Sequence, residues 1–239
     1  MERLQGMDFS AVFKRIGCAN DAKASCNFIH LAIYKIAERK NKSASTNTIA
    51  MYIGTAPASV TDMLKRLAGK QMINYERYKG VTLTTIGGRE ATQLIRRHRL
   101  WEVFLASRLR FSWEAVHDIA EELEHIKSEE LVNRLDAYLD YPKFDPHGDP
   151  IPNAQGKFTL RNQMSLSAAL PGNKVVLLGV REHETSFLEY LNELNIGLGT
   201  EFTIKAFNNF DKSMNILIDH IKETLLSEKV CQILLVKKI

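Results

Sequence analysis

The first hundred residues combine helical spacing of apolar positions with one pair of strand-like runs. Apolar residues recur at helical intervals over 22–40, over a short segment 46–54 that ends at a glycine, and over 57–69, where a proline fits the first turn. Residues 74–87 hold two β-prone runs about a Tyr-Lys-Gly turn, which predicts a hairpin. Helix, short helix, turn, helix and hairpin is the order of a winged helix-turn-helix module.

The pattern changes twice in the rest of the chain. Amphipathic helices are predicted over 88–109, 116–125 and 127–139. Residues 141–156 then hold four of the six prolines, which predicts a linker or an ordered irregular loop. From residue 174 onward, short β-rich runs with one helical piece among them predict a small barrel-like domain. The predicted fold is therefore mainly α with α+β parts.

Composition narrows the class of protein without naming a function. A hydrophobic content of 45% and a charged content of 25% are ordinary for a globular chain of 239 residues. The sequence contains no run of about 18 apolar residues, so no membrane span is predicted. Charges interrupt the first 20 residues, which argues against a signal peptide, and a cytoplasmic location is therefore expected. Three widely spaced cysteines match neither a disulfide framework nor a zinc finger.

The charge distribution favours a polyanionic partner for the front of the chain. Residues 1–100 carry 17 lysines and arginines against 7 acidic residues, whereas residues 101–239 carry 15 against 21. In a winged helix-turn-helix, the start of the second helix reaches base edges and nearby basic residues meet phosphates. The candidate DNA contacts are Ala58, Ser59, Thr61, Asp62, Lys65, Arg66, Arg77 and Lys79. The competing interpretation is a small α+β domain with ordinary surface lysines.

Histidines and glutamates gather at helical spacings in two adjacent predicted helices. His98 and Glu102 lie four residues apart on one helix, and His117 lies on the next. A second set on the flank that carries His117 comprises Glu121, Glu124 and His125. A divalent cation would remove the repulsion between such carboxylates and bind the imidazole lone pairs, although an exposed acidic helix face is the alternative.

The donor chemistry selects among metals and argues against an enzyme. Nitrogen and carboxylate oxygen donors without a thiolate favour six-coordinate Mn²⁺ or Fe²⁺ over a tetrahedral structural zinc. The sequence has no P-loop, no GxSxG motif and no obvious pairing of a nucleophile with a base. A metal-dependent hydrolase would also leave the basic front of the chain unexplained.

Several motifs together resemble the diphtheria-toxin-repressor and manganese-repressor (DtxR/MntR) family of metal-dependent transcriptional regulators. The motifs are "RRHRLWEVFL", "VHDIAEELEH" and "DPHGDPIP", and the resemblance extends over roughly residues 25–239. It implies five segments: an N-terminal extension (1–24), a winged helix-turn-helix DNA-binding domain (25–92), a helical dimerisation and metal-binding domain (93–145), a Pro-rich linker (146–173) and an SH3-like, FeoA-type small β-barrel (174–239).

The same resemblance implies two metal sites. His98, Glu102 and His117 match the family's ancillary site, which Glu184 from the C-terminal domain would join. The primary, activating site matches Glu121, Glu124 and His125. A glutamate at position 121, where iron-responsive members commonly have a cysteine, indicates manganese. Phe28 departs from the family, because it occupies the position of a Met or Asp ligand and a phenyl ring cannot ligate.

The implied function is metal-gated DNA binding with Mn²⁺, or else Fe²⁺, as corepressor. A homodimer is expected to bind a palindromic operator in double-stranded DNA when loaded with metal, and to repress metal-uptake genes. Neither a membrane nor a small organic substrate is an expected partner. The alternative that Phe28 keeps open is a winged-helix protein with structural metal sites that binds DNA independently of metal.

Overall fold

The computed structural model describes residues 29, 32–34, 36, 44–76 and 80–239, which divide into two compact units at Arg96/Arg97. Each unit is described separately. The predicted first helix falls mostly outside the described residues, as do the N-terminal extension and three residues singled out above, Phe28, Arg77 and Lys79. Across the described part of the chain, every helix is too short or too polar to span a membrane.

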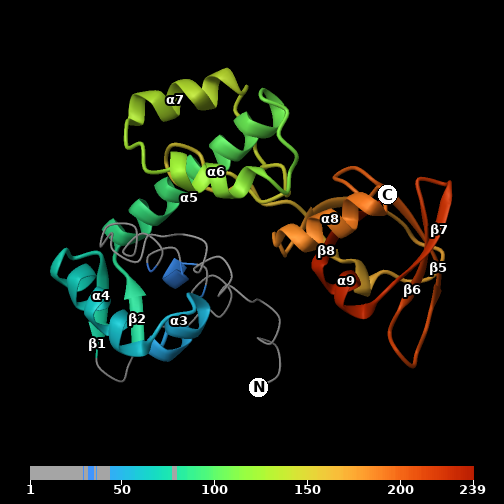
Figure 1. The fold of residues 1–239 in the computed structure, drawn as a ribbon, viewed down its shortest axis with the longest axis horizontal. Helices are drawn as coiled ribbons and strands as arrows, with labels where there is room; N and C mark the ends of the chain where they lie inside the picture. The colour runs from blue at the N-terminus through green and yellow to red at the C-terminus, as the bar shows by residue number, and fades with distance from the viewer. Residues whose placement is uncertain (1–28, 30–31, 35, 37–43, 77–79) are drawn as a thin grey trace. The chain divides into compact units, whose positions relative to one another are not determined.

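The first unit contains the predicted helix-turn-helix and wing (Figure 1). Its elements are α3 (Thr46–Tyr52), α4 (Pro57–Gly69), β1 (Ile73–Glu76) and β2 (Gly80–Leu83), the two strands pairing antiparallel. The Ser45 side chain caps α3 by accepting a hydrogen bond from the Thr48 amide at 3.0 Å. Pro57 occupies the first turn of α4, where a missing N–H has no cost.

A continuous apolar core holds these elements together. Ile49 of α3 and Val60, Leu64 and Leu67 of α4 are fully buried beside Ile29 and Ile33. The period of three and four residues on α4 turns its apolar face inward and leaves its other face to solvent. The predicted winged helix-turn-helix is therefore confirmed.

The second unit begins with helices that carry the predicted metal donors. They are α5 (Thr85–Ser107), which starts in the first unit, α6 (Val116–Leu123) and α7 (Glu129–Tyr138). Val116 and Ala120 of α6 pack against Leu105 of α5. The α6 helix ends two residues earlier than predicted, so Glu124 is its C-cap and His125 lies beyond it.

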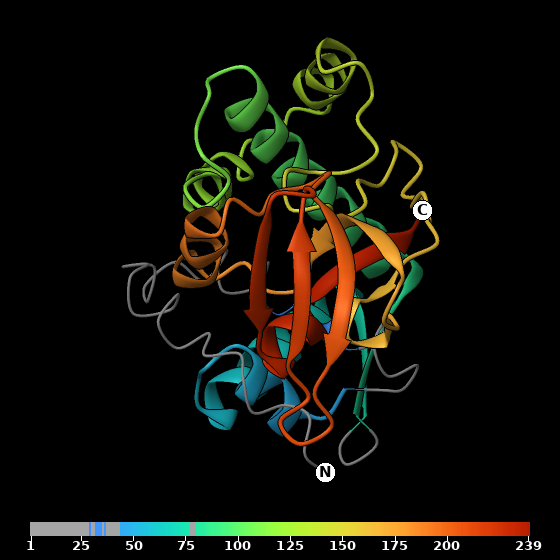
Figure 2. The ribbon, with the colours of Figure 1, turned by 90° about the vertical axis from the view of Figure 1, so that its right-hand side faces the viewer.

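The C-terminal part is a six-stranded antiparallel sheet in the order β3-β8-β4-β5-β6-β7, and Figure 2 shows its strands side by side. The strands are β3 (Met164–Ser165), β4 (Lys174–Val180), β5 (Glu201–Phe207), β6 (Met214–Ile218), β7 (Lys222–Leu226) and β8 (Leu234–Lys238). Two helices accompany them, α8 (Thr185–Glu193) and α9 (Glu228–Ile233). Only α8 is predicted from the sequence, whereas α9 emerges from the structure.

The Pro-rich segment is an ordered loop where it follows α7. Phe144 and Pro150 form a β-bridge, and the Asp145 carboxylate accepts hydrogen bonds from the amides of His147 (2.8 Å) and Asp149 (3.0 Å). The loop contacts strand β4, whose pairing with β8 is irregular between Leu177 and Gly179, through a hydrogen bond that the Val180 amide donates to the His147 carbonyl at 3.0 Å. The prolines left open a linker or an ordered irregular loop, and residues 144–150 form the ordered loop.

Candidate metal centre

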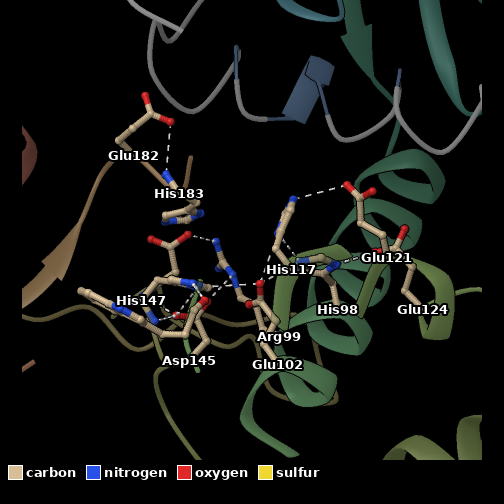
Figure 3. A network of polar contacts seen from close by, with 12 residues as sticks. His98, Arg99, Glu102, His117, Glu121, Glu124, Asp145, His147, Glu182 and His183 are labelled. Atoms are coloured by element: carbon tan, nitrogen blue, oxygen red, sulfur yellow. Dashed lines mark hydrogen bonds and ion pairs between the residues drawn. The ribbon is translucent and has the colours of Figure 1, made fainter. Parts of the chain in front are cut away.

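Three predicted donors meet where α5 approaches α6 (Figure 3). His98 Nε2 lies 3.0 Å from Glu102 Oε1 and 3.2 Å from His117 Nδ1, and His117 Nδ1 lies 3.3 Å from the same Glu102 oxygen. One helical turn separates His98 from Glu102, which places both side chains on one face of α5. The structure therefore brings together His98, Glu102 and His117 as a group able to hold a cation.

Two donors of the predicted second set join this network instead of forming a separate cluster. His98 Nδ1 lies 2.9 Å from Glu124 Oε2, and His117 Nε2 lies 3.4 Å from Glu121 Oε1. Within the described residues, Glu121, Glu124 and His125 do not assemble into a metal-binding group of three. His125 is exposed, because α6 has already ended at Leu123. Its role as a primary-site ligand stays a prediction.

The electrostatics of the network favour protons on its imidazoles when no cation is bound. Burial alone would lower the pKa of His98, but the carboxylates of Glu102 and Glu124 raise it to about 10. Burial alone would raise the pKa of the Glu102 carboxyl, but the neighbouring histidines, His98 foremost, bring it well below its usual value. A cation that binds here has to displace protons, so its affinity depends on pH.

A second group, which the sequence reasoning missed, lies on the other side of Glu102. It consists of Glu102, Asp145 and His147, all buried. His147 Nδ1 lies 3.7 Å from Glu102 Oε1 and 4.0 Å from Asp145 Oδ1. The motif "DPHGDPIP" contains both new residues, and an aspartate and a histidine two positions apart in a turn-rich segment were the available signal.

The burial and orientation of the His147 ring suit its Nδ1 atom to bind a metal ion. The ring is fully buried, and its Nε2 lies 2.8 Å from the Trp113 carbonyl oxygen. A carbonyl only accepts, so Nε2 carries the hydrogen and Nδ1 faces Glu102 and Asp145, without a hydrogen-bond partner of its own. Orienting a histidine through its second nitrogen is typical of metal ligands.

Among the described residues, the other predicted site residues belong to neither group. Glu184 is exposed at the N-cap of α8, where its Oε1 accepts a hydrogen bond from Ser186 at 2.9 Å, and its ligand role stays a prediction. The predicted base-contacting and phosphate-contacting residues of α4 lie off its buried face. These are Ala58, Ser59, Asp62, Lys65 and Arg66, which are exposed, and Thr61, which is half-buried.

Comparison with known proteins gives the chain its family. Residues 31–81 match the model described as the iron dependent repressor N-terminal DNA binding domain. Residues 84–153 match the iron dependent repressor metal binding and dimerisation domain, and residues 164–238 match the FeoA domain. The MntR transcriptional regulator of Oceanobacillus iheyensis is 34% identical over 113 residues, which are 47% of this chain and 76% of that protein. The chain belongs to the DtxR/MntR family.

Two further matches bear on a DtxR/MntR assignment. A solved manganese-dependent transcriptional repressor in complex with manganese superposes with a TM-score of 0.79 and 30% identity, covering 90% of this chain and all of that one. A probable metal transport system membrane protein of Chlamydia trachomatis is 43% identical over 76 residues, which are 32% of this chain but only 17% of that protein. As a DtxR/MntR protein, the chain is a metal-dependent transcriptional repressor and not an enzyme.

Proposed function

We propose that this protein represses metal-uptake genes by binding a palindromic operator as a homodimer when it is loaded with Mn²⁺, with Fe²⁺ as the less favoured corepressor. The observation that carries the choice of metal is the donor set. Among the described residues, every metal-donor side chain in the network around Glu102 offers an imidazole nitrogen or a carboxylate oxygen, and Glu121 is one of the carboxylates. Carboxylate-rich donors without a thiolate favour six-coordinate Mn²⁺ or Fe²⁺ over a tetrahedral structural zinc, although affinity order alone would let Zn²⁺ compete in vitro.

The similarity between this chain and a solved manganese-dependent repressor in complex with manganese also supports Mn²⁺ as the corepressor. The segment shared with a chlamydial metal transport membrane protein supports metal uptake as the regulated process. We infer the homodimer from the matched dimerisation domain and the palindrome from the two-fold symmetry that a dimer imposes on its binding site.

The network suggests how the chain itself responds to metal. His98 and Glu102 belong to α5, whereas His117 and Glu121 belong to α6, so occupancy of the site ties the two helices together. A bound divalent cation supplies positive charge that neutralises the converging carboxylates. The helix α5 starts two residues after the wing strand β2, so ordering α5 restricts the DNA-binding domain and lowers the entropy lost on binding the operator.

The DNA contacts are proposed to come from α4. Ala58, Ser59, Thr61 and Asp62 in its first turns would face base edges, and Lys65 and Arg66 would neutralise phosphates. Arg77 and Lys79 of the wing would add two phosphate contacts.

Titration of the apo-protein tests the proposal. Binding to candidate promoter DNA is followed by fluorescence polarisation at fixed salt while Mn²⁺, anaerobic Fe²⁺ or Zn²⁺ is added, since phosphate contacts make affinity strongly salt-dependent. We expect micromolar Mn²⁺ to switch binding on in the wild type and not in Glu124→Ala. Glu130→Ala is the matched control, because Glu130 is an exposed glutamate that pairs only with Arg134 in the described structure.

The outcomes separate the two functions considered for the chain. A normal Mn²⁺ response of Glu124→Ala would refute the site assignment. DNA affinity that is unchanged by metal and by a chelator would favour the alternative, a winged-helix protein with structural metal sites and metal-independent DNA binding.

A further inference from the structure

An arginine from the segment before β3 lies in the seam between the loop at 145–149 and strand β4. Arg161 Nη2 donates to the Gly148 carbonyl of the loop, and the same nitrogen donates to the Leu178 carbonyl of β4 at 2.6 Å. The guanidinium also lies over the ring of Phe144, just before the loop, with its Cζ 4.1 Å from the ring centroid. A single cation therefore contacts both the loop region and the strand.

Two glycines make room for this arginine. A Cβ placed on Gly148 would lie 2.7 Å from Arg161 Nη2, and a Cβ placed on Gly179 would lie 2.9 Å from the same atom. Both distances are well inside the separation of about 3.5–4.0 Å at which non-bonded heavy atoms attract best. The guanidinium therefore occupies space that the side chains of other residues would take at these two positions.

The two carbonyls that Arg161 binds lie outside the regular pairing of the sheet. The pairing of β4 with β8 shifts between Leu177 and Gly179, so Leu178 falls in the irregularity. Gly148 belongs to the loop. A hydrogen bond from a charged donor is stronger than one from a neutral donor, and a buried carbonyl that loses its donor is costly. Arg161 therefore holds the loop against the strand.

The backbone held in this way carries His147. The residue after it, Gly148, is bound by Arg161, and its own carbonyl accepts from the Val180 amide at 3.0 Å. The ring is fixed at its other end, where Nε2 donates to the Trp113 carbonyl at 2.8 Å. Between these two anchors, Nδ1 of His147 lies 3.7 Å from Glu102 Oε1.

We propose that Arg161 is a positioning residue for metal binding. Its hydrogen bonds go to Gly148, Leu178 and Gln163, so it acts through the loop backbone and not as a ligand. Its role rests on the proposed metal dependence of the protein. Metal–ligand distances tolerate changes of only about 0.2 Å, so a loop that drifts from β4 weakens the hold on an ion. The C-terminal sheet thereby sets part of the metal affinity.

Titration of the full-length protein with Mn²⁺, without DNA, tests this role. Arg161→Met removes the donors but keeps a long side chain beside Phe144. It should weaken Mn²⁺ binding about 10-fold or more, as loss of the groups that orient metal ligands does elsewhere. Arg161→Lys should bind Mn²⁺ nearly as well as the wild type, because one nitrogen makes both carbonyl bonds and an ammonium has three donors.

The matched control is Arg181→Met. Arg181 directly follows β4 and is exposed, and its Nη1 lies 3.4 Å from the Gln232 carbonyl oxygen. It contributes nothing to the seam that Arg161 occupies, so its replacement should leave the Mn²⁺ affinity unchanged.

Hydrogen exchange of the metal-free variants separates positioning from general destabilisation. In Arg161→Met, the Val180 amide that donates to the His147 carbonyl should exchange faster than in the wild type. The Ile204 amide donates to the Asn173 carbonyl at 2.9 Å elsewhere in the same sheet and should keep its wild-type rate. Arg161→Lys should keep both rates.

Three results would overturn the positioning role. They are wild-type Mn²⁺ affinity in Arg161→Met, a loss of affinity in Arg161→Lys as large as that in Arg161→Met, and a loss of protection at Ile204 as large as that at Val180. Metal-stimulated DNA binding is measured separately. If the affinity and exchange results held while DNA binding ignored Mn²⁺, only the proposed function would fail.

Discussion

Replacing Gly148 by alanine measures how rigidly the loop at 145–149 is held against strand β4. Gly148 has a φ of +87°, and a Cβ placed on it would lie 2.1 Å from the Leu178 carbonyl oxygen and 2.5 Å from the Gly179 Cα. Both are backbone atoms, so neither can move aside as a flexible side chain would. Gly172 is the matched control, because its φ is +84° and a Cβ there would meet no atom within 4 Å.

The two substitutions share one cost and differ in another. The left-handed backbone costs an alanine about 1–2 kcal/mol in each variant, offset by about 0.4–1 kcal/mol from the stiffer unfolded chain. Only Gly148→Ala adds the cost of overpacking, about 1–3 kcal/mol. For a chain of this size, that difference corresponds to a Tm roughly 2–12 °C lower than that of Gly172→Ala.

Chemical and thermal unfolding followed by tryptophan fluorescence gives the comparison. Both tryptophans, Trp101 and Trp113, belong to the second unit, so the signal reports on the unit that contains the loop. We also expect Gly148→Ala to weaken Mn²⁺ binding and Gly172→Ala to leave it intact. Equal Tm values for the two variants would show that the loop yields easily, and the reasoning from close backbone contact would then be wrong.

Three further predictions follow from the described contacts. Lys65→Ala should weaken DNA binding for all sequences and reduce the salt slope by about 1 in a polarisation assay, whereas the exposed Lys174→Ala should not. With a chelator present, the contribution of His98 to the free energy of unfolding is complete below its unfolded pKa of about 6.5 and is lost as pH rises towards its folded pKa of about 10. Urea unfolding at several pH values should show this loss. The free energy of unfolding of His98→Gln should depend less on pH over the same range. Asn192→Ala removes the 2.8 Å hydrogen bond from Trp113 and should cost about 1 kcal/mol, read as a Tm about 2–4 °C lower; an unchanged Tm would show that this bond contributes nothing.

Local periodicity was sufficient to predict most elements from the sequence. The helices α4 to α7, the wing hairpin and the strand-rich C-terminal part all follow from spacings of two, three or four residues. The pairing of His98 with Glu102 is a local property as well, since one helical turn joins them. The periodicity did not predict where α6 ends, which is at Leu123, two residues before the predicted end. It also missed the short helix α9, which has a cap from Ser227 but no long apolar period.

Only the tertiary structure decided which donors meet. His147 reaches Glu102 across 45 positions of sequence because Asp145 turns the loop and the Val180 amide of β4 holds the His147 carbonyl. Helical spacing grouped Glu124 with His125, yet the fold directs Glu124 towards His98 and leaves His125 exposed. Spacing fixes neighbours within one turn of a helix, whereas contacts between elements depend on how apolar faces pack and loops close, which no local pattern encodes.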